Sequence, residues 1–131
     1  MPLIVYTARL QHPKGAYPGG YKATDMLDVT RGTGDIGATF APSRKLLNAA
    51  QACKRKAGKV EADLDLVFEW DARLYLEEMR ESFKRRRSDW EALLSHDLVT
   101  VCCYCATAKR CHRRLLAEIL VRLGAEYMGE R

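Results

Sequence analysis

Residues 99–120 read VTVCCYCATAKRCHRRLLAEIL, and this stretch decides both the fold and the place of a candidate site. An apolar, β-branched run ends in a short polar segment, and an amphipathic helix pattern follows it. Four of the five cysteines lie here. A strand that feeds a helix N-terminus is a common place for an α/β protein to hold an anion. We therefore predict a functional site at this junction.

The rest of the chain repeats the alternation of strand and helix patterns. Short apolar runs predict strands at residues 3–7, 26–30, 98–104 and, at the end of the chain, 125–128. Amphipathic patterns predict helices over about residues 43–57, 63–85, 88–97 and 111–123. Strands separated by helices predict one α/β domain over residues 1–131, a small three-layer sandwich with a short, mostly parallel sheet and about four helices.

Two helix starts have capping signals. Ser43 is a predicted N-cap, and a start at Ala41 with Pro42 in the first turn is the alternative. Ser88 and Glu91 form the S-x-x-E pattern of a capping box.

Composition narrows the function classes. The net charge is +5 and the isoelectric point about 9.0, which favours an anionic partner. An odd number of cysteines, with Cys102 and Cys103 adjacent, argues against a secreted disulfide framework and predicts a cytoplasmic protein. No apolar run approaches the ~20 residues of a membrane helix, so no membrane partner is expected.

Polar side chains follow the predicted strands where each strand ends. In a parallel sheet, ligands collect at the carboxyl ends of the strands, so we expect these side chains to meet the N-terminus of the last helix. The predicted ligand-binding residues are Thr7, Arg9, Thr30, Arg31, His112, Arg113 and Arg114.

Arg113 and Arg114 predict anion binding at the start of the last helix. Free amide groups and the helix dipole attract phosphate there, and a guanidinium adds a bidentate contact. The alternative is that both arginines are solvated or pair with Glu118 and Glu126. His112, on the inward side of the helix, is predicted to brace the cysteine segment.

The same segment allows thiol chemistry. A cysteine at a helix N-terminus beside cations is enriched in thiolate, which makes Cys111 the candidate nucleophile and Cys105 the second choice. The arrangement is similar to the strand–Cys–loop–Arg–helix order of cysteine phosphatases and rhodaneses. The C-x(5)-R spacing of the phosphatases is absent, which argues against that activity.

A metal site would use Cys103, Cys105, Cys111 and His112, four ligands that suit zinc. All four lie in one short span, whereas a tetrahedral site usually draws pairs of ligands from two separated segments. Metal binding is therefore not favoured, and the residues indicate no particular cofactor.

The segments CCYC, CHRRLLAEIL and LGAEYMGER resemble the C-terminal signature of the "domain of unknown function 488" family. IVYTARL, LDVT and FAPS are similar to the first strand, second strand and first helix start of that family. The resemblance implies a small α/β protein. It also implies a site that includes the signature residues Cys103, Cys105, Cys111, His112 and Arg113.

Together these observations predict a protein that binds a phosphorylated small molecule, of the nucleotide class, at residues 103–114. One alternative is a nucleic-acid-binding module that uses the basic residues of segments 44–59 and 84–87. The other is a zinc-stabilised structural or interaction protein. The oligomeric state is not predicted.

Overall fold

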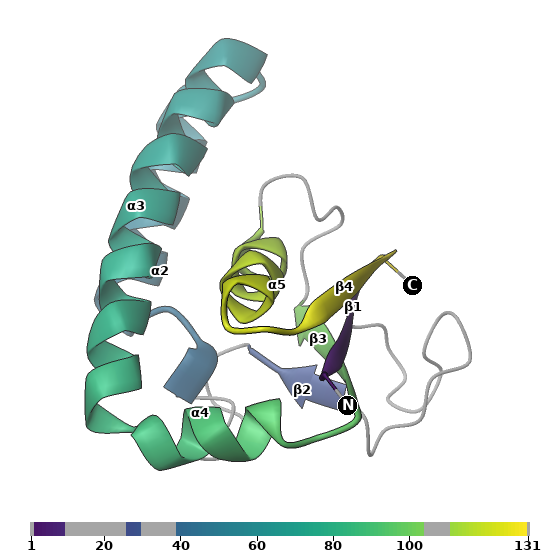
Figure 1. Ribbon diagram of the computed structural model, residues 1–131. Helices are drawn as coiled ribbons and strands as arrows, with labels where there is room; N and C mark the ends of the chain where they lie inside the picture. Colours follow the sequence, from purple (N-terminus) through teal and green to yellow (C-terminus); the bar gives the residue numbers. More distant parts are fainter. Residues whose placement is uncertain (1, 10–25, 30–38, 104–110, 131) are drawn as a thin grey trace.

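All four strands form one parallel sheet in a computed structural model that describes residues 2–9, 26–29, 39–103 and 111–130. The sheet has the order β2-β3-β1-β4, and four helices accompany it within these ranges (Figure 1). The elements are β1 (Ile4–Arg9), β2 (Met26–Asp28), α2 (Arg44–Ala57), α3 (Glu61–Arg85), α4 (Arg87–Leu94), β3 (Leu98–Cys103), α5 (His112–Arg122) and β4 (Glu126–Glu130). The predicted small α/β fold is confirmed.

The face of the sheet that α5 covers carries the main core. Its members include Val5, Val99, Val101 and Cys103 from the strands and Leu115, Leu116 and Leu120 from α5. On the opposite face Ala8 and Cys102 form a second, small cluster with Met26. Successive strand residues point to opposite faces, so Cys102 and Cys103 separate as their alternation predicts.

The parallel register brings the carboxyl ends of the strands to one edge of the sheet. Arg9 of β1 lies opposite Cys103 of β3, and Asp28 of β2 lies opposite Cys102. Because Arg9 stands two residues after Thr7, both project toward the face that α5 covers. This edge is where a ligand site is expected in a sheet of this kind.

One extra residue in β4 decides which face its last residue presents. The pairing of β4 with β1 shifts at Met128, which has no register partner, and Gly129 follows with φ of 113°. Glu130 then lies opposite Thr7. Without the extra residue Glu130 would lie opposite Ala8 and point to the other face. The bulge therefore aims the Glu130 side chain toward α5.

Helices α2 and α3 form a hairpin, with α3 on the outer side of α5 (Figure 1). The predicted N-cap Ser43 is confirmed, since its side chain accepts a hydrogen bond from the Leu46 N–H at 3.1 Å. Helix α2 ends at Gly58, which has φ of 63° and donates its N–H to the Lys54 carbonyl.

Helix α3 has 25 residues and a length of about 37 Å. Its buried residues are Asp71, Tyr75 and Met79, all in the part that packs against the rest of the protein. Residues 61–70 include no buried side chain. The start of α3 and the end of α2 therefore extend past α5 as a two-helix arm (Figure 1).

The predicted capping box at Ser88 is wrong, because α4 begins earlier, after Arg86. The Arg86 N–H donates to the Ser82 carbonyl at the end of α3, while the Arg86 carbonyl accepts from the Asp89 N–H. The Asp89 carboxylate also accepts a hydrogen bond from the Thr39 hydroxyl at 2.8 Å. Tertiary contacts of Arg86 and Asp89 therefore set the start of α4, and Ser88 falls within its first turn.

Candidate functional site

The N-terminus of α5 lies at the carboxyl edge of the sheet. Cys111 is its N-cap residue, with an extended backbone and no hydrogen bond from its side chain to the helix. The first turn of α5 contains no acidic residue. The dipole at this end of α5 is therefore not offset by a carboxylate in its own first turn.

Arg113 joins this helix start to two strands. Its side chain is fully buried, and Nη1 donates to Cys103 Sγ at 3.1 Å and to Cys111 Sγ at 3.6 Å. Nε donates to Glu130 Oε1 at 3.1 Å, and Nη2 donates to Glu130 Oε2. One guanidinium thus holds two thiols and a carboxylate, and we call Cys103, Cys111, Arg113 and Glu130 the thiol–arginine cluster.

The charges in the thiol–arginine cluster stabilise each other. Burial opposes the charge of Arg113, but its hydrogen bonds with Glu130 and Cys103 outweigh burial and raise the pKa of Arg113 further above neutrality. Partial burial likewise acts to raise the pKa of Glu130. The hydrogen bonds that Glu130 accepts from Arg113 and Thr7 outweigh it and hold this pKa below its ordinary value of 4.5.

Thr7 and Tyr127 extend the cluster along the sheet. The Thr7 hydroxyl donates to Glu130 and lies 2.7 Å from the Tyr127 hydroxyl. A hydroxyl has one proton to give, so the Tyr127 hydroxyl is the donor to Thr7. The resulting chain of hydrogen bonds links the Glu130 carboxylate to Thr7 and Tyr127.

His112, at the start of α5, is held by a residue of α3. Its Nε2–H donates to both carboxylate oxygens of Asp71, at 3.1 and 3.2 Å, and Asp71 is 2 % exposed. The His112 ring lies 4.8 Å from the Tyr75 ring. Burial, with added effects of Cys111 and Glu78, raises the pKa of Tyr75 well above 10.0, so its hydroxyl stays protonated and donates to the Phe40 carbonyl at 2.6 Å.

Two of the predicted cations face solvent around the thiol–arginine cluster. Arg9 is exposed at the end of β1, beside Cys103. Arg114 is also exposed, lies 3.7 Å from a Glu118 carboxylate oxygen, and stands over the Tyr127 ring at 5.1 Å. Arg114 therefore pairs with Glu118, which is one of the alternatives that the sequence left open. Arg113 pairs instead with Glu130 and is fully buried.

Three predicted site residues, Cys105, Thr30 and Arg31, lie outside the described residues. Among the residues described, no group of three or more His, Cys, Asp or Glu side chains could hold a metal ion. The described members of the predicted zinc set have other contacts, since Arg113 donates to Cys103 and Cys111 and Asp71 accepts from His112.

Sequence reasoning missed the acidic partners of this site. Glu130 lies beyond the predicted last strand, and only the bulge turns it toward Arg113. Asp71 did carry a signal, because it stands four residues before Tyr75 on the apolar stripe of α3. A carboxylate at such a position requires a buried partner.

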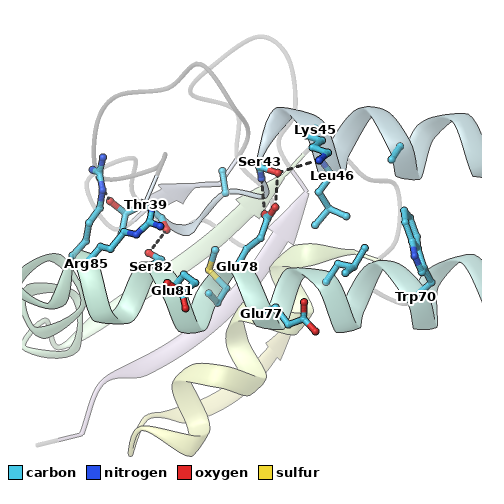
Figure 2. A pocket seen from close by; sticks show the side chains of 15 residues that line it. Thr39, Ser43, Lys45, Leu46, Trp70, Glu77, Glu78, Glu81, Ser82 and Arg85 are labelled. Carbon is cyan, nitrogen blue, oxygen red and sulfur yellow. Dashed lines mark hydrogen bonds between the residues drawn. The ribbon is translucent and has the colours of Figure 1, made fainter.

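A cavity lies elsewhere, between α2 and α3 (Figure 2). It has a volume of about 730 Å³, with Trp70 toward one end and Arg85 toward the other. Glu78 points across it to the start of α2, where its carboxylate accepts hydrogen bonds from the Ser43 N–H, at 2.8 Å, and from the Ser43 hydroxyl. Acidic and basic side chains both line this cavity, so its charge selects no ligand class.

None of the helices in the described ranges combines the length and apolar composition that crossing a bilayer requires. Neither the curated proteins nor the solved structures contain a match to the chain. Residues 21–124 match the family model DUF488-N3a, described as "Active DUF488-N3 subclade". This match includes β2, β3, α5 and the cysteine signature, and the chain therefore belongs to the DUF488 family.

Proposed function

We propose that the protein acts in the cytoplasm and binds a phosphorylated small molecule, of the nucleotide class, at the carboxyl edge of the sheet, where Cys111 serves as a thiol nucleophile. The observation that carries this proposal is the contact of one buried guanidinium, Arg113, with both Cys103 Sγ and Cys111 Sγ. A buried cation held against two sulfur atoms at a helix start is an arrangement that favours thiolate.

The arginines at this edge have two different roles, depending on whether their side chains are buried or exposed. Arg113 is enclosed and paired with Glu130, so it positions the thiols and does not contact the ligand. The exposed cations Arg9 and Arg114 remain to contact phosphate. The first turn of α5 adds backbone N–H groups that point toward the same edge.

Cys111 is better placed than Cys103 for nucleophilic chemistry. Both sulfurs accept a hydrogen bond from Arg113, but Cys111 is also the N-cap residue of α5, so the helix dipole adds to the charge of the guanidinium. His112, the residue after Cys111, is fixed by Asp71, and this contact anchors the start of α5 to α3.

The nucleic-acid alternative receives less support from the described contacts. In the basic run at residues 84–87, Lys84 lies 3.7 Å from Glu81 and Arg87 lies 3.4 Å from Glu91, so carboxylates stand beside two of its cations and lower the net positive charge of this surface. Binding to nucleic acid needs cations that are available to phosphates.

Titration calorimetry with a panel of nucleoside mono-, di- and triphosphates tests the binding. We expect one ligand class to bind the wild type and to lose about two- to fivefold in affinity with either Arg9→Gln or Arg114→Gln, the loss typical of an exposed charge contact. Arg55→Gln, on the exposed surface of α2, is the matched control. Absence of binding to every nucleotide, or equal losses in all three variants, would refute the proposal.

Alkylation with iodoacetamide tests the thiol. We expect Cys111 to react at neutral pH and the bound nucleotide to protect it, read by the mass of its peptide. Equal rates for Cys111 and the half-buried Cys53, with no protection by nucleotide, would contradict a nucleophilic role for Cys111.

A further inference from the structure

A second cavity lies between α3 and α5, away from the thiol–arginine cluster, and has a volume of about 330 Å³. Its walls are apolar side chains of both helices, including Leu76, Phe83, Ile119 and Leu123. Trp90 of α4 also lines it, with its ring edge-to-face on Phe83 at 5.7 Å. The Trp90 indole N–H donates to the Ser82 hydroxyl at 3.1 Å, so no polar atom of this ring needs a partner from the cavity.

Three cations surround this apolar space. Arg80 and Lys84 stand one turn apart on α3, and Arg122 stands on α5. The lining among the described residues includes no carboxylate. Lys84 approaches the carboxylate of Glu81 at 3.7 Å, but both side chains are more than half exposed, so this pair is weak. We call Arg80, Lys84 and Arg122 the cationic rim.

We propose that this groove binds a small anionic amphiphile from solution, namely an alkyl carboxylate of about ten carbon atoms. Such a ligand has one apolar and one anionic end, and the groove offers an apolar interior and a cationic rim. The volume equals that of roughly eleven water molecules, which is the size of a chain of that length.

The same volume argues against a protein partner. It lies at the lower end of the range of small-molecule pockets. A stable protein interface would need a contact area of about 1,000 Å² or more, which the groove between two helices does not supply by itself.

Trp90 provides a fluorescent reporter of binding, because its buried ring forms part of the inner wall of the groove. The chain has two tryptophans, so Trp70→Phe leaves Trp90 as the only indole and removes the signal of the larger cavity. The probes are sodium decanoate and, with the opposite charge on a chain of equal length, decyltrimethylammonium. Both are titrated below their micellar concentrations, with calorimetry on the wild type as a second readout.

We expect decanoate to change the Trp90 emission saturably and to bind at least tenfold more tightly than decyltrimethylammonium. Arg80→Gln and Arg122→Gln should each weaken decanoate about two- to fivefold, and higher salt should weaken it further. Leu123→Glu puts a carboxylate on the wall at a position that is 39 % exposed, and it should reduce affinity more than either arginine variant. Arg55→Gln on α2 should leave binding unchanged.

Several results would overturn this inference. One is equal affinity for the two probes, and another is the same affinity in the wild type and in the Arg80→Gln, Arg122→Gln double variant. A third is no response to decanoate together with binding to phosphatidylglycerol vesicles, which would point to a membrane surface. Thermal unfolding of each variant separates loss of binding from loss of the fold.

Discussion

Replacing Glu130 with glutamine should destabilise the protein by leaving the buried charge of Arg113 without its counter-charge. Arg113 is 0 % exposed, whereas the Glu130 side chain is 37 % exposed. Breaking a fully buried pair costs about 3–5 kcal/mol, and an exposed pair contributes about 1 kcal/mol or less. Because water reaches one partner only, we expect Glu130→Gln to cost about 2 kcal/mol.

Urea denaturation and calorimetry measure this cost. For a chain of this size, about 2 kcal/mol corresponds to a fall in Tm of roughly 8 °C. Glu118→Gln is the matched control, since it breaks the pair with Arg114, in which both side chains are about half exposed. This control should change the free energy of unfolding by about 0.5 kcal/mol or less.

Two further measurements can refute the reasoning. With Arg113→Met already in place, Glu130→Gln should cost much less, because the buried charge is gone. An undiminished cost in that background would show that the loss does not arise from the Arg113–Glu130 pair. A cost for Glu130→Gln no larger than that for Glu118→Gln would show the same.

Acid should remove the same stabilisation. The pKa of Glu130 is lowered in the folded state, so its contribution is present above the unfolded value near 4.5 and is lost as the pH falls through the lower, folded value. The difference in stability between wild type and Glu130→Gln should stay constant from pH 5 to pH 8 and shrink below pH 4.5. A difference that grows on acidification would contradict this sign.

Three other substitutions test the elements around the site by urea denaturation. Ser43→Ala should cost about 1–2 kcal/mol, because the helix loses its cap and Glu78 loses a hydroxyl donor. Gly129→Ala should cost about 1–3 kcal/mol from backbone strain alone, since an added Cβ would meet no atom within 4 Å. Asp71→Ala should cost about 1–3 kcal/mol by leaving His112 without its buried acceptor, and it should cost less when His112 is already alanine. Wild-type stability in any of these would contradict the corresponding contact.

Local patterns predicted most elements of this fold. The Ser43 cap and the strand ending at Cys103 depend on neighbouring residues, and both could be recognised from the sequence. The start of α4 could not, because it depends on Arg86 and Asp89, whose contacts include residue Thr39 from a distant segment. A capping pattern is a local signal, and here a tertiary contact outweighed it.

The sequence predicted that several residues of the cysteine junction lie together, but it did not predict how they pair. The spacing of Cys103, Cys111 and Arg113 correctly indicated that they belong to one junction. The pairing of Arg113 with Glu130 depends on an extra residue in β4, and the predicted last strand, which ended at residue 128, did not include the register shift or Glu130. The enclosure of Arg113 could therefore be seen only in the structure.

The two-helix arm has a consequence for local stability. Residues 51–57 at the end of α2 and 61–70 at the start of α3 include no buried side chain, while Tyr75 and Met79 further along α3 belong to the main core. Amide hydrogens should therefore exchange with deuterium fastest at the tip around Gly58 and progressively more slowly toward Met79. Along the single continuous helix α3, protection of the amide hydrogens from exchange would then rise from the lowest to the highest values. The tip of the arm could therefore open and close repeatedly while the sheet and the thiol–arginine cluster stay intact.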